Sequence, residues 1–439
     1  MSLRVKRFVF VACLTSMFLV FSSGIQAQNI RFVKEGASMS NSGQGWNNPS
    51  GDLQAMIDAL DALIKNSNGA ITEGEVWVAG GVGVPPYVPN RPANNTLITS
   101  PGNRDNAFVL RPNVKVYGGF PVPTPANNYN SGLTLVDRDW AAYPTVLDGQ
   151  NYYYHVVVAA GADNAVLDGF TVMNGNANGN GLLHIYVAGN PYPYPIEEHS
   201  GGGIINCSSN SLTLANLVIK ENYAVGNSSY GGGGGIRQYY GGEGSTPSCT
   251  LINTLMYNNT TGYFGGAINV KEGDFDIYSA TISGNNDGGN SNTYSSMQGI
   301  DFQSGGQLTI YNSILWGNTP VSSNLPVNYD IACSLIGGVV FPFGTNLDGN
   351  LDPMFVNVFY GDYRIAANSP CRDKGISSYL YVNYPNTEKD LAGNPRIFGS
   401  RIDMGAYEDQ KIRPNSSGVF FVKQGVSRKQ RTEQREKER

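Results

Sequence analysis

Gly265-Gly266-Ala267-Ile268 is one of four segments in which a glycine-containing run leads into an isoleucine. The four isoleucines stand at positions 204, 236, 268 and 300, so neighbouring copies are 32 residues apart each time. A constant interval of this size predicts a solenoid, because one repeat cannot bury its apolar face alone and must stack on the next. The repeat therefore predicts an architecture and says little about chemistry.

A second element follows each of these segments: an aliphatic residue, two spacers and an asparagine. The pairs are Ile219 and Asn222, Met256 and Asn259, Ile282 and Asn285, and Leu315 and Asn318, with an earlier copy at Met173 and Asn176. Short runs before them alternate inward and outward side chains, which is typical of β-strands. We expect one coil per repeat, with aliphatic side chains stacked inside. The asparagines would form a hydrogen-bonded ladder at sharp corners that need a left-handed backbone. The sequence thus predicts an all-β parallel β-helix.

The N-terminus has the features of a secretory signal peptide, which we assign to residues 1–27. Basic residues precede an apolar run at residues 8–21, and small residues follow up to Ala27. Cleavage is expected after Ala27, with Gly24 as the alternative. The apolar run is too short to span a membrane, and no later stretch reaches the required length. We therefore expect an exported protein, secreted or at the cell surface, with no transmembrane helix in the mature chain.

Residues 52–64 are the one segment with convincing helical periodicity. Ser50 or Asp52 can cap its start, and its apolar residues fall on one face: Leu53, Met56, Ile57, Leu60, Leu63 and Ile64. We expect this helix to cover the first coil, whose apolar end would otherwise be exposed. Residues 28–408 are predicted to form one β-helix domain with this N-terminal cap and a C-terminal closing segment.

Composition narrows the class of partner. Charged residues make up 14% of the chain, against about 25% in ordinary domains. The body is acidic, because the basic surplus lies in residues 428–439, and this argues against nucleic acid as a partner. Four cysteines remain after the signal peptide: Cys207, Cys249, Cys333 and Cys371. Two disulfides are possible, but buried packing as small apolar residues is the favoured interpretation. No metal-type spacing and no cofactor motif is found.

The repeats resemble right-handed parallel β-helix proteins of the pectin-lyase-like type. More narrowly, they resemble repeats of bacterial polymorphic outer-membrane proteins, which pair a Gly-Gly-Ala-Ile motif with a Phe-x-x-Asn motif. Residues 265–268 match the first motif, whereas the second matches at asparagine and carries Ile, Met or Leu in place of Phe. The end of the body, through Asp403-Met404-Gly405-Ala406-Tyr407-Glu408, is similar to the closing segment of secreted bacterial β-helix proteins described as choice-of-anchor. The resemblance implies a single-stranded right-handed parallel β-helix and export, and it supplies no agreed catalytic residues.

Residues 409–439 are predicted to be a charged, disordered tail. Within it, residues 419–425 echo residues 30–36 at the start of the body, because both contain Phe-Val-Lys-x-Gly or a close variant. One hypothesis is that a second module begins here and is cut short. An ordinary charged tail is the alternative.

Candidate catalytic residues are scattered and form no motif. A calcium site of the kind used by β-helix polysaccharide lyases needs six to eight oxygen ligands, and a glycosidase needs two carboxylates at a set separation. The candidate acids are Asp163, Asp168, Glu197, Glu198, Asp274 and Asp276, with Asp274 and Asp276 expected on the same side of a strand. The candidate bases are Lys220, Arg237, Lys271, His155, His184 and His199. A structural role is favoured for each of them, and no metal site is predicted.

Tyrosines in or beside the loops give the stronger functional signal. The predicted binding residues are Tyr152, Tyr153, Tyr192, Tyr194, Tyr239, Tyr240 and Tyr263. Exposed tyrosine beside Asn and Gly suits sugar stacking and protein contacts, and packing over loops is the alternative. We expect a non-catalytic protein that binds a glycan or host or matrix material. The alternatives are a polysaccharide lyase or glycoside hydrolase, acting on a surface or dietary polysaccharide, and a structural surface component.

Overall fold

The computed structural model describes residues 29–411 with short gaps. The gaps are residues 95–101, 124–132, 188–189, 228–230, 243, 245, 289–295, 304, 320–324, 327, 343, 380–383 and 385–387. The predicted signal peptide, the echo at residues 419–425 and most of the predicted tail lie outside the described residues. The chain up to Asp409 forms one compact unit, and all that follows concerns this unit.

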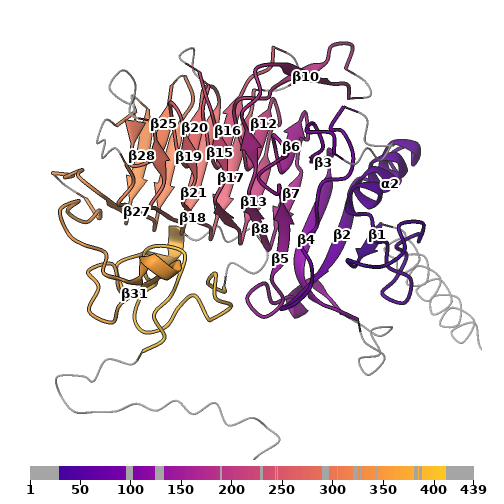
Figure 1. The fold of residues 1–439 in the computed structure, drawn as a ribbon. Coiled ribbons are helices and arrows are strands. Elements are labelled where there is room, and N and C mark those ends of the chain that lie inside the picture. Colours follow the sequence, from indigo (N-terminus) through magenta and orange to yellow (C-terminus); the bar gives the residue numbers. More distant parts are fainter. Residues whose placement is uncertain are drawn as a thin grey trace, which may run out of the picture. The chain divides into compact units, whose positions relative to one another are not determined.

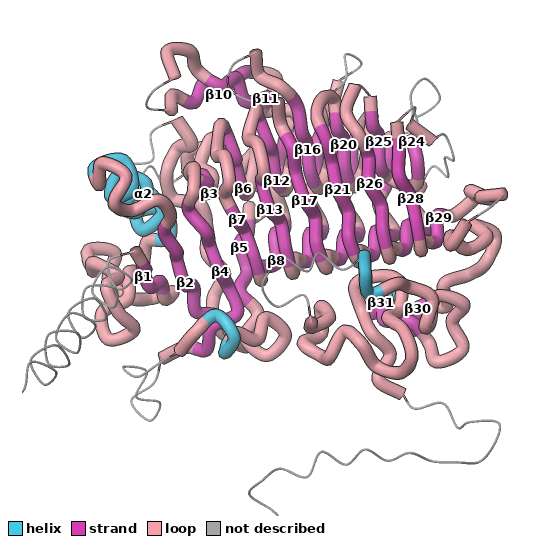
Figure 2. Tube along the Cα trace, turned by 180° about the vertical axis from the view of Figure 1, so that it is seen from behind, coloured by secondary structure: helices cyan, strands magenta, loops and turns pink. Residues whose placement is uncertain are grey.

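Long parallel sheets dominate this unit, which is mostly β and solenoid-like (Figures 1 and 2). Sheet A runs in the order β1 (Ile30–Val33), β2 (Gly74–Gly80), β4 (Val114–Pro121), β7 (Val166–Asp168), β13 (Leu212–Ala215), β17 (Ser248–Ile252), β21 (Asp274–Tyr278), β26 (Leu308–Tyr311) and β28 (Tyr329–Ala332). Sheet B runs β5 (Thr145–Asp148), β8 (Phe170–Met173), β14 (Val218–Lys220), β18 (Leu255–Tyr257), β22 (Thr281–Ser283), β27 (Ile314–Trp316) and β29 (Leu335–Ile336). Sheet C is short: β9 (Asn176–Ala177), β15 (Tyr223–Ala224), β19 (Thr260–Thr261) and β23 (Asn286–Asp287).

Sheet D completes each turn of the chain. It runs β3 (Phe108–Leu110), β6 (Val157–Ala160), β12 (Ile204–Cys207), β16 (Ile236–Tyr239), β20 (Ile268–Val270), β25 (Ile300–Phe302) and β24 (Ser296–Met297), the last pairing antiparallel. Between β12 and β25 the chain passes through sheets A, B and C before it returns to sheet D. The coil expected from the repeat is therefore observed.

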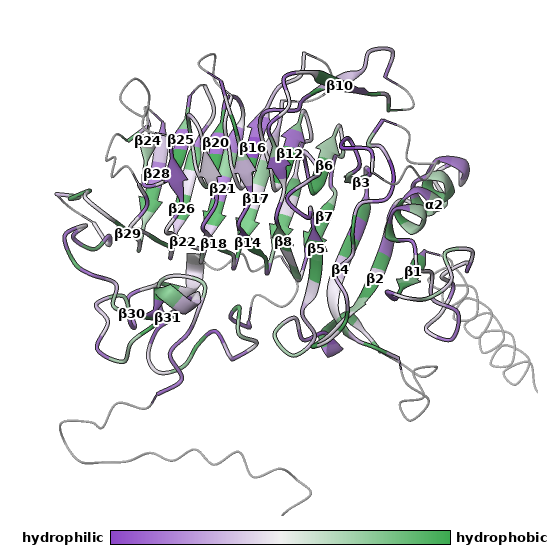
Figure 3. Ribbon diagram, in the orientation of Figure 1, coloured by the Kyte–Doolittle hydropathy of each residue, from purple (hydrophilic) through white to green (hydrophobic). Residues whose placement is uncertain are grey.

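The 32-residue interval corresponds to lateral strand pairing in sheet D. Ile204 pairs with Ile236, Ile236 with Ile268, and Ile268 with Ile300, always in parallel register. All four side chains are buried. Hydrophobic (green) and hydrophilic (purple) residues alternate along the strands in Figure 3, as expected for side chains that point alternately into and out of the coil.

The predicted asparagine ladder is confirmed for four residues. The side-chain Nδ2 of Asn222 donates to Oδ1 of Asn259, Asn259 to Asn285, and Asn285 to Asn318, each at 2.9 Å. Two details were wrong. The earlier copy is displaced by one residue, because Asn176 pairs with Tyr223 and the position equivalent to Asn222 is Gly175.

The second correction concerns the backbone. The left-handed conformation belongs to the residue before each ladder asparagine: Glu221, Asn258, Gly284 and Gly317 have φ of 56°, 54°, 67° and 68°. At the corner between sheets A and B the expectation holds, because Asn216, Asn253 and Asn312 have a left-handed backbone themselves. Asn253 donates to Asn216 there at 2.7 Å.

The four cysteines Cys207, Cys249, Cys333 and Cys371 are buried, and none of them is in a disulfide. Cys249 lies among the core residues between the sheets, and Cys207 lies under a hairpin on the outer face of sheet D. They pack as small apolar side chains, which is the interpretation the sequence favoured.

The predicted helix is present as α2 (Leu53–Asn66), and the side chain of Asp52 caps it by accepting from the Ala55 N–H at 3.0 Å. α2 packs against β1, β2, β3 and β4. Gln54 pairs with the backbone of Val109 in β3, an edge strand of sheet D: it accepts from the Val109 N–H at 2.7 Å and donates to its carbonyl at 3.1 Å. The helix thus satisfies backbone groups that an edge strand leaves open.

Apart from the antiparallel β24–β25 pair of sheet D, the described residues contain two further hairpins and three short 3₁₀ turns. The hairpins pair β10 (Leu182–Ile185) with β11 (Tyr194–Glu197) and β30 (Phe355–Asn357) with β31 (Asp362–Ile365). The 3₁₀ turns are η1 (Leu135–Asp137), η2 (Val358–Tyr360) and η3 (Ser377–Tyr379). Among the residues that the structure describes, no helix combines the length and apolar character needed to cross a membrane.

The C-terminal segment of the unit packs against the corner between sheets A and B. Gly405 donates its N–H to the Asn312 carbonyl at 2.7 Å, and Ala406 donates to Oγ1 of Thr281 at 2.9 Å. Trp140 Nε1 donates to the Leu391 carbonyl at 3.1 Å. These contacts attach a segment from the end of the unit to coils formed much earlier in the chain.

Candidate functional site

The outer face of sheet D carries two rows of side chains in strand register. One row is Ile205, Arg237, Asn269 and Asp301, which are lateral partners in β12, β16, β20 and β25. The second row contains Cys207 and Tyr239, which pair with each other, and continues to Lys271 and Gln303 just beyond β20 and β25. Each row therefore changes from apolar to polar along the stack.

The β10–β11 hairpin covers the apolar part of this face. Leu183, Ile185, Tyr194 and Ile196 of the hairpin pack with Val158, Ile205, Cys207 and Tyr239 of the sheet. The hydroxyl of Tyr239 donates to the Pro195 carbonyl. Burial raises the pKa of the Cys207 thiol to about 12 and that of Tyr239 well above its usual value. These groups are neutral packing residues at physiological pH.

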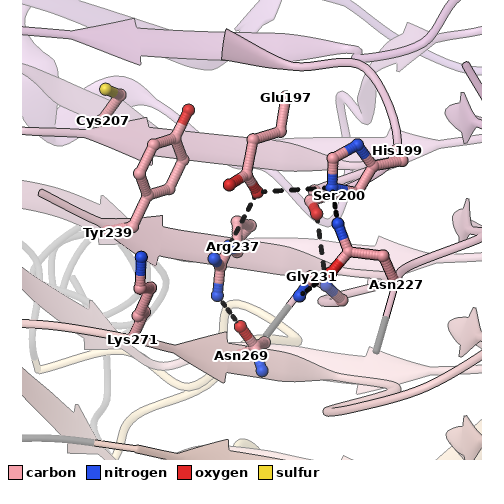
Figure 4. A network of polar contacts seen from close by, with 12 residues as sticks. Glu197, His199, Ser200, Cys207, Asn227, Gly231, Arg237, Tyr239, Asn269 and Lys271 are labelled. Atoms are coloured by element: carbon pink, nitrogen blue, oxygen red, sulfur yellow. Dashed lines mark hydrogen bonds and ion pairs between the residues drawn. The ribbon is translucent and has the colours of Figure 1, made fainter. Parts of the chain in front are cut away.

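A polar network begins where the hairpin ends (Figure 4). Glu197 Oε2 lies 3.4 Å from Arg237 Nε and 3.9 Å from His199 Nε2, and the latter is 2.6 Å from Asn227 Nδ2. Arg237, only 1% exposed, also donates to Oδ1 of Asn269. The network therefore links a carboxylate of the hairpin to the row of side chains on the sheet.

The row continues to a buried carboxyl group. Asn269 Nδ2 donates to Asp301 Oδ2 at 2.7 Å, and Gln303 donates to the same oxygen. Burial raises the pKa of Asp301 to about 6. Burial, followed by repulsion from Asp301, raises the pKa of Asp287 in β23 to about 7. Two carboxyl groups near one end of the network thus bind protons more readily than usual.

Burial shifts the pKa values of two histidines downward, opposite to those of the carboxyl groups. His155 is buried and its Nδ1 lies 3.0 Å from the Gly201 carbonyl. Burial lowers the pKa of His155 to about 4 and also lowers that of His199. Both are neutral at pH 7, so neither supplies a positive charge to the face. His184 projects from the outer side of β10 and is exposed.

Most of the remaining candidate acids and bases have structural contacts. Asp168 is buried, with Oδ1 2.9 Å from Arg138 Nη2, and it accepts from the Tyr384 hydroxyl at 2.8 Å. Asp163 accepts from the Asn210 N–H and Glu198 from the Gly181 N–H. Lys220 Nζ lies 3.3 Å from Glu221 Oε1 and 5.8 Å from the centre of the Tyr257 ring. Asp274 and Asp276 lie on the same side of β21, as predicted, but in sheet A.

The seven predicted tyrosines do not form one patch. Tyr152, Tyr192 and Tyr240 are 43%, 57% and 40% exposed, and Tyr263 is half-buried. The expectation of exposed rings is wrong for Tyr153, Tyr194 and Tyr239, which are 6%, 5% and 3% exposed. Tyr194 and Tyr239 belong to the hairpin core, and Tyr153 packs edge-on against Tyr152. Ligand binding by the others stays a prediction.

Tyr240 and Tyr152 lie in two different polar settings. The N–H of Tyr240 donates to Glu272 Oε2 at 2.9 Å, and Lys271, 36% exposed, lies 3.8 Å from the other oxygen of Glu272. Arg104 stacks on two rings, 5.5 Å from the centre of Tyr152 and 4.1 Å from that of Tyr154. Each setting offers an aromatic ring beside charged donors or acceptors.

Sequence reasoning missed Asn227, Asn269, Asp287, Asp301 and Gln303. A signal for two of them was present, because Asn269 and Asp301 directly follow the periodic isoleucines and must point outward where the isoleucines point inward. Asn227 and Asp287 reach the region from loops and from sheet C, and no interval marks them. Within the described ranges, no three or more His, Cys, Asp or Glu side chains gather in a group that could hold a metal ion.

Neither the models of known protein families nor the curated proteins contain a significant match to this chain.

Proposed function

We propose that this chain is an exported right-handed parallel β-helix protein, related in fold to the pectin-lyase-like group and capped at its N-terminal end by α2. The parallel register of the sheets and the asparagine ladder support the coil. Support for the cap comes from Gln54, which occupies the open edge of β3, and from two ion pairs, Arg91–Asp52 and Arg111–Asp58, that hold the helix to the first coils. The basic and apolar N-terminal residues support export to the surface or medium.

Its function, we propose, is non-catalytic binding of a glycan or of host or matrix material. The observation that carries this proposal is Tyr240, 40% exposed beside Lys271 and Glu272 at the edge of the hairpin. An exposed ring flanked by charged groups suits a sugar, which offers an apolar ring face and a rim of hydroxyls. Tyr152 beside Arg104 offers the same combination elsewhere on the coil.

Catalysis is the second candidate, and Asp287 and Asp301 favour it. A general acid that acts near neutral pH needs a raised carboxyl pKa, and these two have pKa values of about 7 and 6. Their exposure argues against it, since they are only 4% and 0% exposed. Asp301 is also committed to Asn269 and Gln303. A polysaccharide lyase or hydrolase would need this region to open.

Glycan-array binding by the full chain tests the two candidates. Combined Tyr152→Ala, Tyr192→Ala and Tyr240→Ala should weaken binding by about fivefold at each site, since one aromatic contact contributes about 1 kcal/mol. Tyr360→Ala is the matched control, because Tyr360 is 80% exposed on the distant β30–β31 hairpin. Unchanged binding by the triple variant would rule out the tyrosine sites. Unsaturated or new reducing-end products from incubated polysaccharides would favour the enzyme.

A further inference from the structure

The outer face of sheet A carries a second set of aligned polar side chains that the proposed function does not use. Its central row is Thr250, Asp276, Thr309 and Asp330, lateral partners in β17, β21, β26 and β28. Asp274 lies two residues before Asp276 on the same side of β21, and Tyr278 and Tyr311 pair on the other side of the row. The residues between them, such as Phe275 and Ile277, point inward and are buried.

This part of the face is open, whereas the N-terminal part of the same sheet is covered. Over β2, β4 and β7 a largely aromatic cluster closes the outer side. Its buried members are Trp46, Trp77, Ala79, Tyr117, Phe120 and Val166. From β21 onward Asp274 and Asp330 are exposed, and Asp276, Tyr278 and Tyr311 are partly exposed. A ligand can therefore reach the row.

Among the described residues, the aspartates of this face form no ion pair. None of the ion pairs among the described residues involves Asp274, Asp276 or Asp330. Their hydrogen bonds come from neutral groups: the Gln307 N–H to Asp274 at 2.8 Å, the Tyr311 hydroxyl to Asp330, and Thr309 to Asp276. Burial, with repulsion from Asp274, raises the pKa of Asp276. Because these carboxylates form no ion pair among the described residues, a bound cation would relieve the repulsion between Asp274 and Asp276.

We propose that this open face of sheet A binds a glycan that carries amino groups, with the three aspartates facing its cations. The chemistry of the neighbouring side chains points to a glycan. Threonine and tyrosine hydroxyls line the row, and the rings of Tyr278 and Tyr311 lie 5.6 Å apart at 74°, which offers an apolar edge for a sugar ring. Strands repeat about every 4.8 Å, and aspartate returns at every second strand of the row, as Asp276 in β21 and Asp330 in β28, which suits a repeating polymer. The inference rests on the proposed function only in taking the ligand to be a glycan.

Titration of the full chain with a β-linked glucosamine hexamer, measured by calorimetry, tests the proposal. We expect binding that weakens as salt rises and that the N-acetylated hexamer does not reproduce. Combined Asp274→Asn, Asp276→Asn and Asp330→Asn should weaken binding by about tenfold or more, because three charge contacts are lost. The matched control, Glu73→Gln with Glu221→Gln and Asp348→Asn, removes the same charge elsewhere and should change binding less than about twofold.

Three results would overturn the proposal: unchanged binding by the aspartate variant, equal binding of the acetylated hexamer, or tighter binding of an oligolysine than of the glucosamine hexamer. The last would assign the face to a basic peptide. The Tyr152, Tyr192 and Tyr240 variant keeps the two proposals separate. If it loses array binding while the glucosamine hexamer still binds through the aspartates, the face of sheet A acts alone. If only the aspartate substitutions leave binding unchanged, the tyrosine sites stand without the face of sheet A.

Discussion

Sheets A and D present outward side chains by the same alternation, yet their polar residues end in opposite environments. On sheet D, Glu197 from the hairpin reaches Arg237, and the polar row beyond it is buried as far as Asp301. On sheet A, Asp274 and Asp330 remain exposed and have no ion pair in the part of the chain that the structure describes. The scaffold places side chains on both faces, and what the connecting segments cover decides whether those side chains stabilise the fold or meet a ligand.

The hairpin accounts for the covered apolar end of sheet D and for the partner of Arg237. It is inserted between β9 and β12, and it brings four apolar residues and Glu197 over sheet D. On sheet A, by contrast, Asp274 and Asp330 on either side of the Asp276 position are exposed. A charged residue under cover needs a partner, because an unpaired buried charge is strongly destabilising, whereas an exposed one does not.

Tyr239 and Tyr240 give the largest expected contrast, since adjacent residues fall on either side of this boundary. Tyr239→Ala should lower the free energy of unfolding by about 4 kcal/mol, because it removes a buried ring from the hairpin core. Tyr240→Ala should change it by less than about 0.5 kcal/mol. Chemical denaturation of both variants measures the difference. Equal losses would mean that the hairpin does not hold sheet D as the contacts indicate.

Much of the fold was predictable because it depends on local and periodic rules. The interval at Ile204, Ile236, Ile268 and Ile300 reports strand register directly, since a lateral partner must recur once per coil. The Asp52 cap of α2 follows from side-chain chemistry within one turn of helix. The misplacement of Asn176 by one residue has a physical cause: the first coils lack the asparagine and put Gly175 at that position, so the spacing no longer marks it.

The candidate site was much less predictable, because it depends on which segments lie over which face. Nothing near Tyr194 or Tyr239 in the sequence indicates that both side chains enter one apolar cluster. Nor does the sequence indicate that the Tyr239 hydroxyl bonds to the Pro195 carbonyl, 44 residues earlier in the chain. Arg237 was identifiable as a candidate, but its partner Glu197 comes from the inserted hairpin. Asn269 and Asp301 were within reach of the periodicity, one residue after each isoleucine.

The protonation of Asp301 makes the stability of sheet D depend on pH, which tests the comparison between the two faces. The pKa of Asp301 is about 6 in the folded state, which is above its value in the unfolded chain. At a pH between these two values, the folded protein holds a proton on Asp301 that the unfolded chain has released. Stability from this group is therefore present at about pH 4 and is lost as pH rises through about 6. Asp301→Asn removes that loss, and the variant should gain about 3 kcal/mol on the wild type between pH 4 and pH 8.

Urea denaturation at a series of pH values measures this gain. Part of it comes from Asp287, whose pKa falls when the repulsion from Asp301 is removed. Asp348→Asn, at an exposed carboxylate on another segment, is the control and should leave the pH profile parallel to that of the wild type. A parallel profile for Asp301→Asn as well would mean that Asp301 is ionised in the folded protein, and that sheet D tolerates a charge in its buried row.

The smallest effect is expected on the open face of sheet A, where stability and ligand binding should separate. Asp274→Asn combined with Asp276→Asn removes two like charges on one side of β21, and this relieves the repulsion that helps to raise the pKa of Asp276. The melting temperature should stay the same or rise slightly, with a change in the free energy of unfolding within about 0.5 kcal/mol. Thermal unfolding followed by circular dichroism, at low and at high salt, measures it, and the slight gain should vanish at high salt because screening removes the same repulsion. A clear loss of stability would mean that these carboxylates hold the sheet together as Glu197 does on sheet D through Arg237, and the contrast between the two faces would then be one of exposure alone.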